Sequence, residues 1–247
     1  FGWMRKDGTR RFRIVYIECA RKNGKSTEAA GTGLYLAFAD EEPGAEVYSA
    51  ATKFDQAVIV HGEAVRMVRA QPEFARMGIE TYKNNICNPD PRKNQKYEPL
   101  GADEQTMDGY NVHGAIIDEL HAHRTRGVYD LMDTGTSARR QPILWAITTA
   151  GTDQTEASVC WEQHVYTEQI LRGIVQDDSH FGMIFCLDKG DDWTEEKNWC
   201  LAGATEVYAK IDRGITVCSI QSLCEDYDIA TASVWDGRTW VKVLGWS

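Results

Sequence analysis

The sequence lacks several features that would place it in other classes of protein. No apolar run approaches the roughly 18 residues that a membrane-spanning helix needs, and no signal peptide is visible. No internal repeat is present either. The chain also begins at Phe1 without a methionine, from which we expect a fragment or a processed product.

The cysteines also form no recognisable motif, and the chain has no net positive charge. The seven cysteines form no C-x-x-C pair. An odd, unpatterned set in a chain of this length indicates reduced, cytosolic thiols rather than a disulfide framework. The formal net charge is −10, which argues against a protein coated in nucleic acid but leaves room for a local basic groove.

The sequence does contain enough apolar residues for a core, and its patterns alternate between predicted strands and predicted helices. With 247 residues, of which 43% are hydrophobic and 26% charged, the chain can bury a sizeable core. Residues 13–19 and 46–50 predict buried strands, and residues 25–38 and 54–70 predict helices. This alternation predicts an α/β fold with a mostly parallel central sheet flanked by helices. The apolar face of the second helix is predicted from Phe54, Ala57, Val58, His61, Val65 and Val68.

The rest of the chain gives weaker patterns. Residues 83–111 are rich in polar residues and predict short edge strands with a long surface loop. Further strands are predicted at 113–120, 142–151 and 181–187, and a further helix at 157–173. The pattern weakens after residue 203, and residues 204–247 are the least readable part of the chain.

A segment between the first predicted strand and helix has the form of a phosphate-binding loop. Residues 19–26 read C-A-R-K-N-G-K-S, against the usual G-x-x-x-x-G-K-[ST]. Gly24 would let the backbone pass close to the phosphates, Lys25 would reach the β- and γ-phosphates, and Ser26 would hold Mg²⁺. Cys19 stands where a glycine is usual, and cysteine enters positive φ less freely. The alternative is a basic loop that only caps a helix.

An acidic pair follows a later apolar strand. Asp118 and Glu119 come directly after Ile116 and Ile117. Such a pair would supply one carboxylate for Mg²⁺, Asp118, and a general base for attack on the γ-phosphate, Glu119. The alternative is a strand that ends in solvated acids. The loop upstream favours the catalytic interpretation, because the two elements support each other.

Hydroxyl side chains follow another strand. Thr148 and Thr149 come before Ala150 and Gly151. In a parallel sheet, polar groups at the carboxyl ends of strands converge on the ligand crevice. A threonine there would sense the γ-phosphate and pass its presence on, although a plain turn is nearly as compatible with the local sequence.

The histidines do not form a recognisable metal motif. His121 and His123 flank one residue, which is not the order of the zinc proteases, and no third ligand is evident. We interpret His61, on the apolar face of its helix, as a core histidine rather than a ligand.

Taken together, these residues resemble the large terminase subunit of tailed bacteriophages, the motor that pumps DNA into capsids. The resemblance covers about residues 1–200 and rests on six blocks in the family's order: FGW and DGTRRFR (1–13), ARKNGKST (20–27), GAEVYSAATKFDQA (44–57), DGYNVHGAIIDELHAH (108–123), RRQPILWAITTAGTD (139–153) and FGMIFCLDKGDDW (181–193). In this family the loop often reads R-K-N-G-K-S without the leading glycine, which would account for Cys19.

The resemblance implies a P-loop ATPase of the additional-strand class that uses ATP and Mg²⁺. The nucleotide-binding residues it implies are Arg21, Lys22, Asn23, Gly24, Lys25, Ser26 and Thr27. It assigns Mg²⁺ to Ser26 and Asp118, catalysis to Glu119 together with Arg21, and the coupling of hydrolysis to DNA movement to Thr148 and Thr149. An arginine finger from a neighbouring subunit is also implied, and four residues are eligible: Arg124, Arg126, Arg139 and Arg140.

The resemblance also implies partners and a setting. They are double-stranded DNA, a small terminase subunit and a portal protein, with the chain in a homo-oligomeric ring on the capsid, in the cytoplasm of the bacterial host and away from membranes. We expect residues 1–190 to form the ATPase domain, N-terminally truncated because the family's adenine-recognising segment lies upstream of Phe1. We expect residues 191–247 to be a linker and an unassigned remnant, too short for the family's nuclease domain, so nuclease activity is not expected.

Other functions remain compatible with the sequence. The chain would be a nucleotide- or DNA-binding scaffold if it bound ATP without turnover. Strand unwinding or phosphate transfer to a metabolite would instead indicate a helicase or a kinase.

Overall fold

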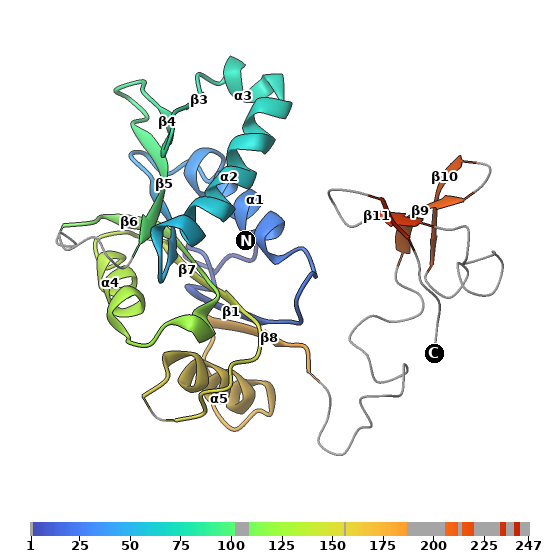
Figure 1. Cartoon of the computed structure of the whole chain (residues 1–247). Coiled ribbons are helices and arrows are strands. Elements are labelled where there is room, and N and C mark those ends of the chain that lie inside the picture. Colours follow the sequence, from blue (N-terminus) through green and yellow to red (C-terminus); the bar gives the residue numbers. More distant parts are fainter. Residues whose placement is uncertain are drawn as a thin grey trace. The chain divides into compact units, whose positions relative to one another are not determined.

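The computed structural model describes residues 2–101, 109–155 and 157–186, and beyond them only the backbone of four strands. The chain divides into two units, Phe1–Ile184 and Phe185–Ser247, each described here by itself (Figure 1). Within the described residues, no helix is long and apolar enough to span a membrane.

The first unit is built on an eight-stranded sheet in the order β3-β4-β5-β2-β6-β7-β1-β8. The strands are β1 (Ile14–Glu18), β2 (Glu46–Ala51), β3 (Glu80–Thr81), β4 (Ile86–Asn88), β5 (Gln95–Gly101), β6 (Val112–Asp118), β7 (Ile143–Thr148) and β8 (His180–Ile184). The run from β5 to β8 is parallel, and β3 and β4 pair antiparallel at one edge. The predicted mostly parallel sheet is therefore confirmed.

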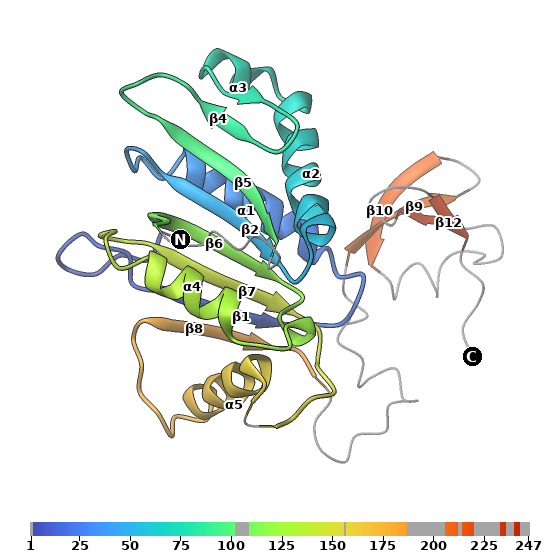
Figure 2. The same ribbon diagram turned by 60° about the vertical axis from the view of Figure 1, so that its left-hand side comes forward.

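Helices cover both faces of this sheet (Figure 2). They are α1 (Lys25–Phe38), α2 (Phe54–Ala70), α3 (Pro72–Arg76), α4 (Gly127–Gly135) and α5 (Val159–Leu171), with a 3-10 turn η1 at Leu120–Ala122. Because side chains alternate along a strand, β1 sends Val15 and Ile17 into a core shared with α1 and α2. Tyr16 points to the opposite core, which is shared with α4 and α5.

The two long predicted helices have the bounds that the sequence predicted, 25–38 and 54–70. The buried face of α2 is rotated by part of a turn, because it centres on Val60 and Ala64 rather than on Val58 and Val65. His61 is 1% exposed and its Nε2 lies 3.2 Å from the Tyr97 carbonyl oxygen, which confirms a core histidine.

Other predicted elements differ from the structure. β3 and β4 confirm the short edge strands, but β5 is an inner strand whose Tyr97 and Leu100 are buried, so a surface loop at 95–101 was wrong. Residues 102–108 of the predicted loop lie outside the described residues. The strand predicted at 113–120 ends at Asp118, because Glu119 adopts a left-handed conformation with φ 52°. No pattern in the sequence predicted α4.

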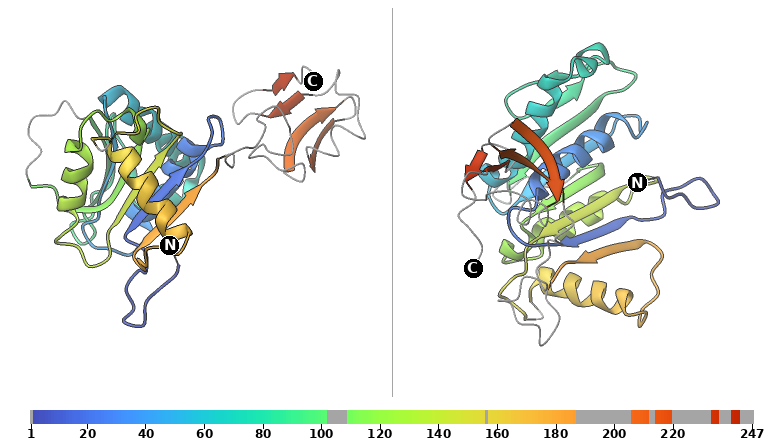
Figure 3. Two further views of the ribbon diagram at one scale, coloured as in Figure 1. Left: turned by 90° about the horizontal axis from the view of Figure 1, so that it is seen from below. Right: turned by 90° about the vertical axis from the view of Figure 1, so that its right-hand side faces the viewer.

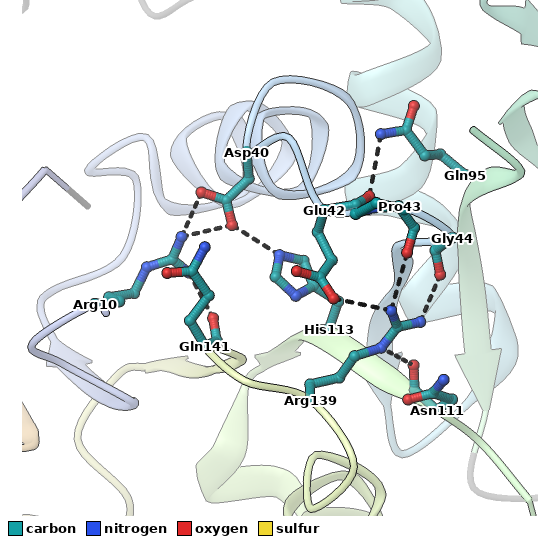
Figure 4. A network of polar contacts seen from close by, with 10 residues as sticks. All are labelled: Arg10, Asp40, Glu42, Pro43, Gly44, Gln95, Asn111, His113, Arg139 and Gln141. Atoms are coloured by element: carbon teal, nitrogen blue, oxygen red, sulfur yellow. Dashed lines mark hydrogen bonds and ion pairs between the residues drawn. The ribbon is translucent and has the colours of Figure 1, made fainter. Parts of the chain in front are cut away.

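A buried polar network closes the edge of the sheet where the parallel strands begin (Figure 4). Asp40, just after α1, accepts hydrogen bonds from Arg10 at 2.5 Å and from His113 Nε2 at 2.7 Å. Burial raises the pKa of the Asp40 carboxyl, but the bonds from His113 and Arg10 outweigh it and leave the pKa below its usual value. The network therefore fastens α1 to β6 and to the segment before β1.

Arg139 extends the same network toward β2. Its guanidinium donates to the carbonyl oxygens of Asn111, Pro43 and Gly44 and to Glu42. Its side chain is 8% exposed. This structural role takes Arg139 out of the set of candidate arginine fingers.

We expect Asp40→Ala to lower the free energy of unfolding by about 2–3 kcal/mol, because two buried donors lose their shared acceptor. Urea denaturation would measure this. Asp40→Asn is the matched control, since it keeps one acceptor oxygen and should lose less. Equal midpoints for wild type and Asp40→Ala would contradict the prediction.

An N-terminal hairpin extends from the first unit (Figure 3). Met4 and Arg10 form its antiparallel bridge. The exposed Trp3 ring packs edge-on to Phe12, and the Arg11 guanidinium lies 4.2 Å from the Trp3 ring centroid. Phe12 in turn contacts Phe181 of β8, which holds the hairpin base against the sheet.

The second unit contains a four-stranded antiparallel sheet in the order β10-β9-β11-β12. Its strands are β9 (Glu206–Ile211), β10 (Gly214–Ser219), β11 (Ser233–Trp235) and β12 (Trp240–Lys242). This is the stretch in which the sequence pattern was least readable.

Candidate nucleotide site

The loop between β1 and α1 has the backbone of an anion-binding nest. Lys22 and Gly24 both take left-handed conformations, with φ of 66° and 73°. Gly24 caps α1, and the Thr27 and Glu28 N–H groups bond back to its carbonyl oxygen. A turn with left-handed residues at a helix N-terminus points its N–H groups at a common centre.

Cys19 fits this loop without strain. Lys22, Glu41, Asn94 and Glu119 are the non-glycine residues with positive φ in the described part of the chain, and Cys19 is not one of them. Its N–H donates to the Thr148 carbonyl oxygen at 3.1 Å, which continues the pairing of β1 with β7, and its side chain joins the core. Glycine is therefore not required at this position.

Lys25 lies inside the loop rather than on its surface. The residue is 7% exposed, and its Nζ donates to the carbonyl oxygens of Ala20 at 3.0 Å and Cys19 at 3.4 Å. The neighbouring residues are more accessible: Arg21, Lys22, Asn23, Gly24 and Thr27 are exposed and Ser26 is half-buried. A buried ammonium beside open helical N–H groups forms a concentrated positive site.

Asp118 supplies the facing negative charge. It ends β6, in register with Ile147 of β7, and its Oδ1 accepts the Glu119 N–H at 2.9 Å. Burial raises its pKa to about 6, the nearby Glu119 charge adds to the rise, and the Lys25 ammonium opposes it. Lys25 follows β1 and Asp118 ends β6, so the two residues lie at the ends of the strands that flank β7.

Glu119 sits at the tip of this acidic pair. Its left-handed backbone turns the chain out of β6 and caps η1. Its side chain is 37% exposed, and Oε2 lies 3.1 Å from His121 Nδ1. The carboxylate is thus both accessible and held by one neighbour.

Thr148 connects the parts of the site. It is fully buried, lies opposite Glu18 in the β1–β7 register, and its carbonyl oxygen accepts the Cys19 N–H. Its Oγ1 lies 3.1 Å from the His121 N and donates to the Thr149 carbonyl oxygen at 2.9 Å. The structure therefore brings Thr148 against the first residue of the loop and against His121, the neighbour of Glu119, while Thr149 lies beside it with 8% exposure.

Sequence reasoning missed a second support for the loop. Glu18, the last residue of β1, is 4% exposed and accepts bonds from the Tyr16 hydroxyl at 2.7 Å and from His164 Nδ1 at 2.9 Å. The bond from His164 fastens α5 to the base of the loop, and within α5 the His164 ring stacks on Trp161. An acid ending an apolar strand directly before the loop was the available signal.

The remaining candidate arginines differ in their surroundings. Arg126 pairs with Asp130 and Glu162. Arg140 donates to the Asp7 carbonyl oxygen at 3.2 Å, near the hairpin. Arg124 is exposed just beyond η1, and no hydrogen bond or ion pair engages it within the described residues.

The zinc interpretation of the two histidines gains no support. Within the described residues, no group of three or more potential ligands could hold a metal ion. His123 is a core side chain, 6% exposed, and burial lowers its pKa, which favours the neutral form.

The fold and the loop together define a class of protein. β7 lies between the strand that carries the loop, β1, and the strand that carries the acids, β6. A loop of this sequence on this strand order is the arrangement of the P-loop fold of the additional-strand class. The family model for the terminase large subunit, ATPase domain, matches residues 1–169. The chain therefore belongs to the terminase large subunit family, as its sequence motifs predicted.

Relatives agree with this assignment. The chain is 28% identical over 153 residues to the large subunit of the terminase of Enterobacteria phage HK97, covering 60% of this chain and 30% of that protein. It is 44% identical over 88 residues to the protein YmfN of Escherichia coli K12, covering 36% of this chain and 19% of that one.

Solved structures agree on the fold. The crystal structure of the HK97 large terminase matches with a TM-score of 0.65 and 23% identity, over 78% of this chain and 38% of that one. The ATPase domain of the Thermus phage P74-26 large terminase matches with a TM-score of 0.52 and 18% identity, over 71% and 77%. The large terminase of another thermophilic bacteriophage, in complex with ADP, matches with 0.52 and 12% identity, over 70% and 40%. The chain thus spans well under half the length of the HK97 and Escherichia coli relatives.

Proposed function

We propose that this chain is the ATP-hydrolysing motor domain of a viral DNA-packaging terminase, which couples hydrolysis to the movement of double-stranded DNA into a capsid. The observation that supports it most directly is the placement of a buried lysine and an acidic pair on strands that flank β7: Lys25 where the loop after β1 meets α1, and Asp118 and Glu119 at the end of β6. Related terminases, including one solved with ADP, share the fold.

The charges suit a nucleotide triphosphate. The loop residues Arg21 to Ser26 offer backbone N–H groups and the Lys25 ammonium to the phosphates. The Lys25 ammonium would exchange the carbonyl oxygens of Cys19 and Ala20 for phosphate oxygens when ATP binds. Arg21, exposed in the same loop, would add charge at the γ-phosphate.

The chain also offers donors that fit Mg²⁺. The hydroxyl of Ser26 is half-buried beside the loop, and Asp118 carries a carboxylate that burial makes costly to ionise alone. Oxygen donors of this kind are what Mg²⁺ takes, usually with retained water. Bound there, the ion would neutralise charge that develops on the phosphates.

Glu119 is the proposed general base. Its carboxylate would take a proton from water as the water oxygen bonds to the γ-phosphorus, and the bond from that phosphorus to the bridging oxygen would break, which releases ADP. Thr148 and Thr149 would pass the change of state onward to elements that grip DNA.

The motor role implies the assembly. We propose a homo-oligomeric ring on the capsid, working with a small terminase subunit and a portal protein in the cytoplasm of the bacterial host. A neighbour in such a ring would supply an arginine finger. Of the three candidates that remain after Arg139, Arg124 is the best placed, because it is exposed and no hydrogen bond or ion pair engages it within the described residues. The domain that does this work is proposed to be residues 1–190, with 191–247 outside it.

The test of this function is steady-state ATP hydrolysis by the chain with Mg²⁺ and double-stranded DNA, with chelator as the reference. Hydrolysis that stops on chelation is expected. Binding of ATP without turnover would favour a scaffold role instead.

We expect Lys25→Ala to weaken ATP binding at least about tenfold, because a charge-assisted contact to phosphate is lost. Titration with a fluorescent ATP analogue would measure the dissociation constant. Lys6→Ala is the control, since Lys6 lies exposed on the N-terminal hairpin. An equal loss in both variants would point to general charge rather than to the loop.

A further inference from the structure

His121 lies between the proposed general base and the end of β7. Its Nδ1 is 3.1 Å from Glu119 Oε2 on one side and 3.0 Å from Thr148 Oγ1 on the other. Thr149 Oγ1 is a third neighbour at 3.3 Å. One ring nitrogen of a residue without an assigned role therefore touches the acidic pair and both candidate coupling residues.

Proton accounting fixes the direction of these bonds. Glu119 Oε2 approaches Nδ1 at 3.1 Å as a charge contact, whereas the hydrogen bonds of Nδ1 go to Thr148 Oγ1 and Thr149 Oγ1. The Thr148 hydroxyl donates its own hydrogen to the Thr149 carbonyl oxygen at 2.9 Å. Thr148 Oγ1 consequently accepts from His121 Nδ1–H, and the same nitrogen is the group that Glu119 Oε2 approaches.

The backbone keeps His121 in this position. Its N–H donates to Thr148 Oγ1 at 3.1 Å. The turn that follows β7 closes over it, since a Cβ on Gly151 would lie 3.0 Å from the His121 Cβ. If the Glu119 carboxylate moves away, His121 stays in place because moving with it would break these contacts. The movement therefore changes only the hydrogen bond between His121 Nδ1 and Thr148 Oγ1.

We propose that His121 is a positioning residue that couples the orientation of Glu119 to the Thr148–Thr149 segment, an inference that rests on the proposed ATPase function. While Glu119 rests on Nδ1–H, its carboxylate is held away from catalysis and Thr148 shares the hydrogen. When Glu119 turns to take a proton from water, Nδ1–H passes wholly to the threonine hydroxyls. The movement of Glu119 thereby alters the hydrogen bonds at the end of β7, which is also bonded to Cys19, the first residue of the phosphate loop.

The test uses four variants of the 247-residue chain: His121→Ala, His121→Asn, His121→Gln and Thr148→Val. The amide of asparagine takes the place of Nδ1, whereas that of glutamine reaches the place of Nε2. We expect His121→Ala to lower kcat about tenfold with KM for ATP within about twofold, as for the loss of one hydrogen bond to a charged group. His121→Asn should recover most of the rate, and His121→Gln should not.

A double-mutant cycle separates coupling from simple loss of structure. If both residues act through one bond, adding Thr148→Val to His121→Ala should cost little more than either change alone. Additive losses in kcat, failure of His121→Asn to recover the rate, or losses that track the melting temperature would overturn the proposal.

The controls keep the two proposals apart. Wild-type turnover that Glu119→Gln abolishes, together with a His121→Ala rate equal to wild type, would overturn the role of His121 alone. No wild-type hydrolysis under any condition would overturn the proposed function and this inference with it.

Discussion

Glu119→Gln is expected to reduce steady-state ATP hydrolysis at least about a hundredfold, the usual range for removal of a general base. Glutamine keeps the length of the side chain but cannot accept a proton from water. It has no negative charge, so ATP binding should hold or tighten. The measurements are phosphate release at saturating ATP and the dissociation constant of an ATP analogue.

Glu41→Gln provides the matched control. Glu41 is an exposed glutamate with a left-handed backbone, φ 58°, in the turn after α1 near the Asp40 network. Its replacement should leave turnover unchanged. Similar, substantial rates in wild type and Glu119→Gln would remove the assigned base.

Local sequence determined much of the fold. α1 and α2 have the predicted bounds because local features mark where each begins. α1 follows the left-handed Gly24, α2 follows the end of β2, and both continue through an unbroken helical pattern. The strands with continuous apolar runs, β1, β6 and β7, were likewise predictable, since strands buried on both faces read this way.

Partners distant in the sequence explain most of what was missed. β5 carries Lys96, Glu98 and Pro99 and reads as a loop, yet it is an inner strand because Tyr97 packs under α1 against Gly33. α4 is short, and its burial depends on the core that Tyr16 and Tyr48 build on the second face.

The candidate site likewise has parts that the sequence predicts and parts that depend on contacts between distant residues. The loop and the acids form motifs in the sequence and could be named from it. The contacts of His121 with Thr148, and of Glu18 with His164, join residues 27 and 146 positions apart, so no local pattern records them. Whether Cys19 can replace the usual glycine also depends on the backbone conformation, and Cys19 is not among the residues with positive φ.

Asp118→Asn is expected to abolish most ATP hydrolysis, at least about a hundredfold, and at the same time to stabilise the protein. Burial raises the pKa of Asp118 to about 6 from its ordinary 3.8. The folded state therefore binds this proton more tightly than the unfolded state, and stability is lost as the pH rises from about 4 to about 6. Above that range the ionised carboxyl costs roughly 2–3 kcal/mol.

Asparagine is neutral at every pH and can still accept the Glu119 N–H. We expect the variant to melt roughly 4–8 °C above wild type at neutral pH without nucleotide or metal. The difference should vanish near pH 4, where the wild-type carboxyl is protonated. Scanning calorimetry across this range measures it, with Asp133→Asn, an exposed aspartate of α4, as the control.

Adding Mg²⁺ and ATP distinguishes a ligand site from simple burial. Ligands that bind the ionised carboxylate stabilise the wild-type folded state by an amount that grows with the logarithm of their concentration over their dissociation constant. The melting temperature of the wild type should therefore rise toward that of the variant, while the variant itself responds weakly. A variant that melts below wild type at neutral pH, or a gap independent of pH, would mean that Asp118 is stabilised by its surroundings rather than kept ready for a cation.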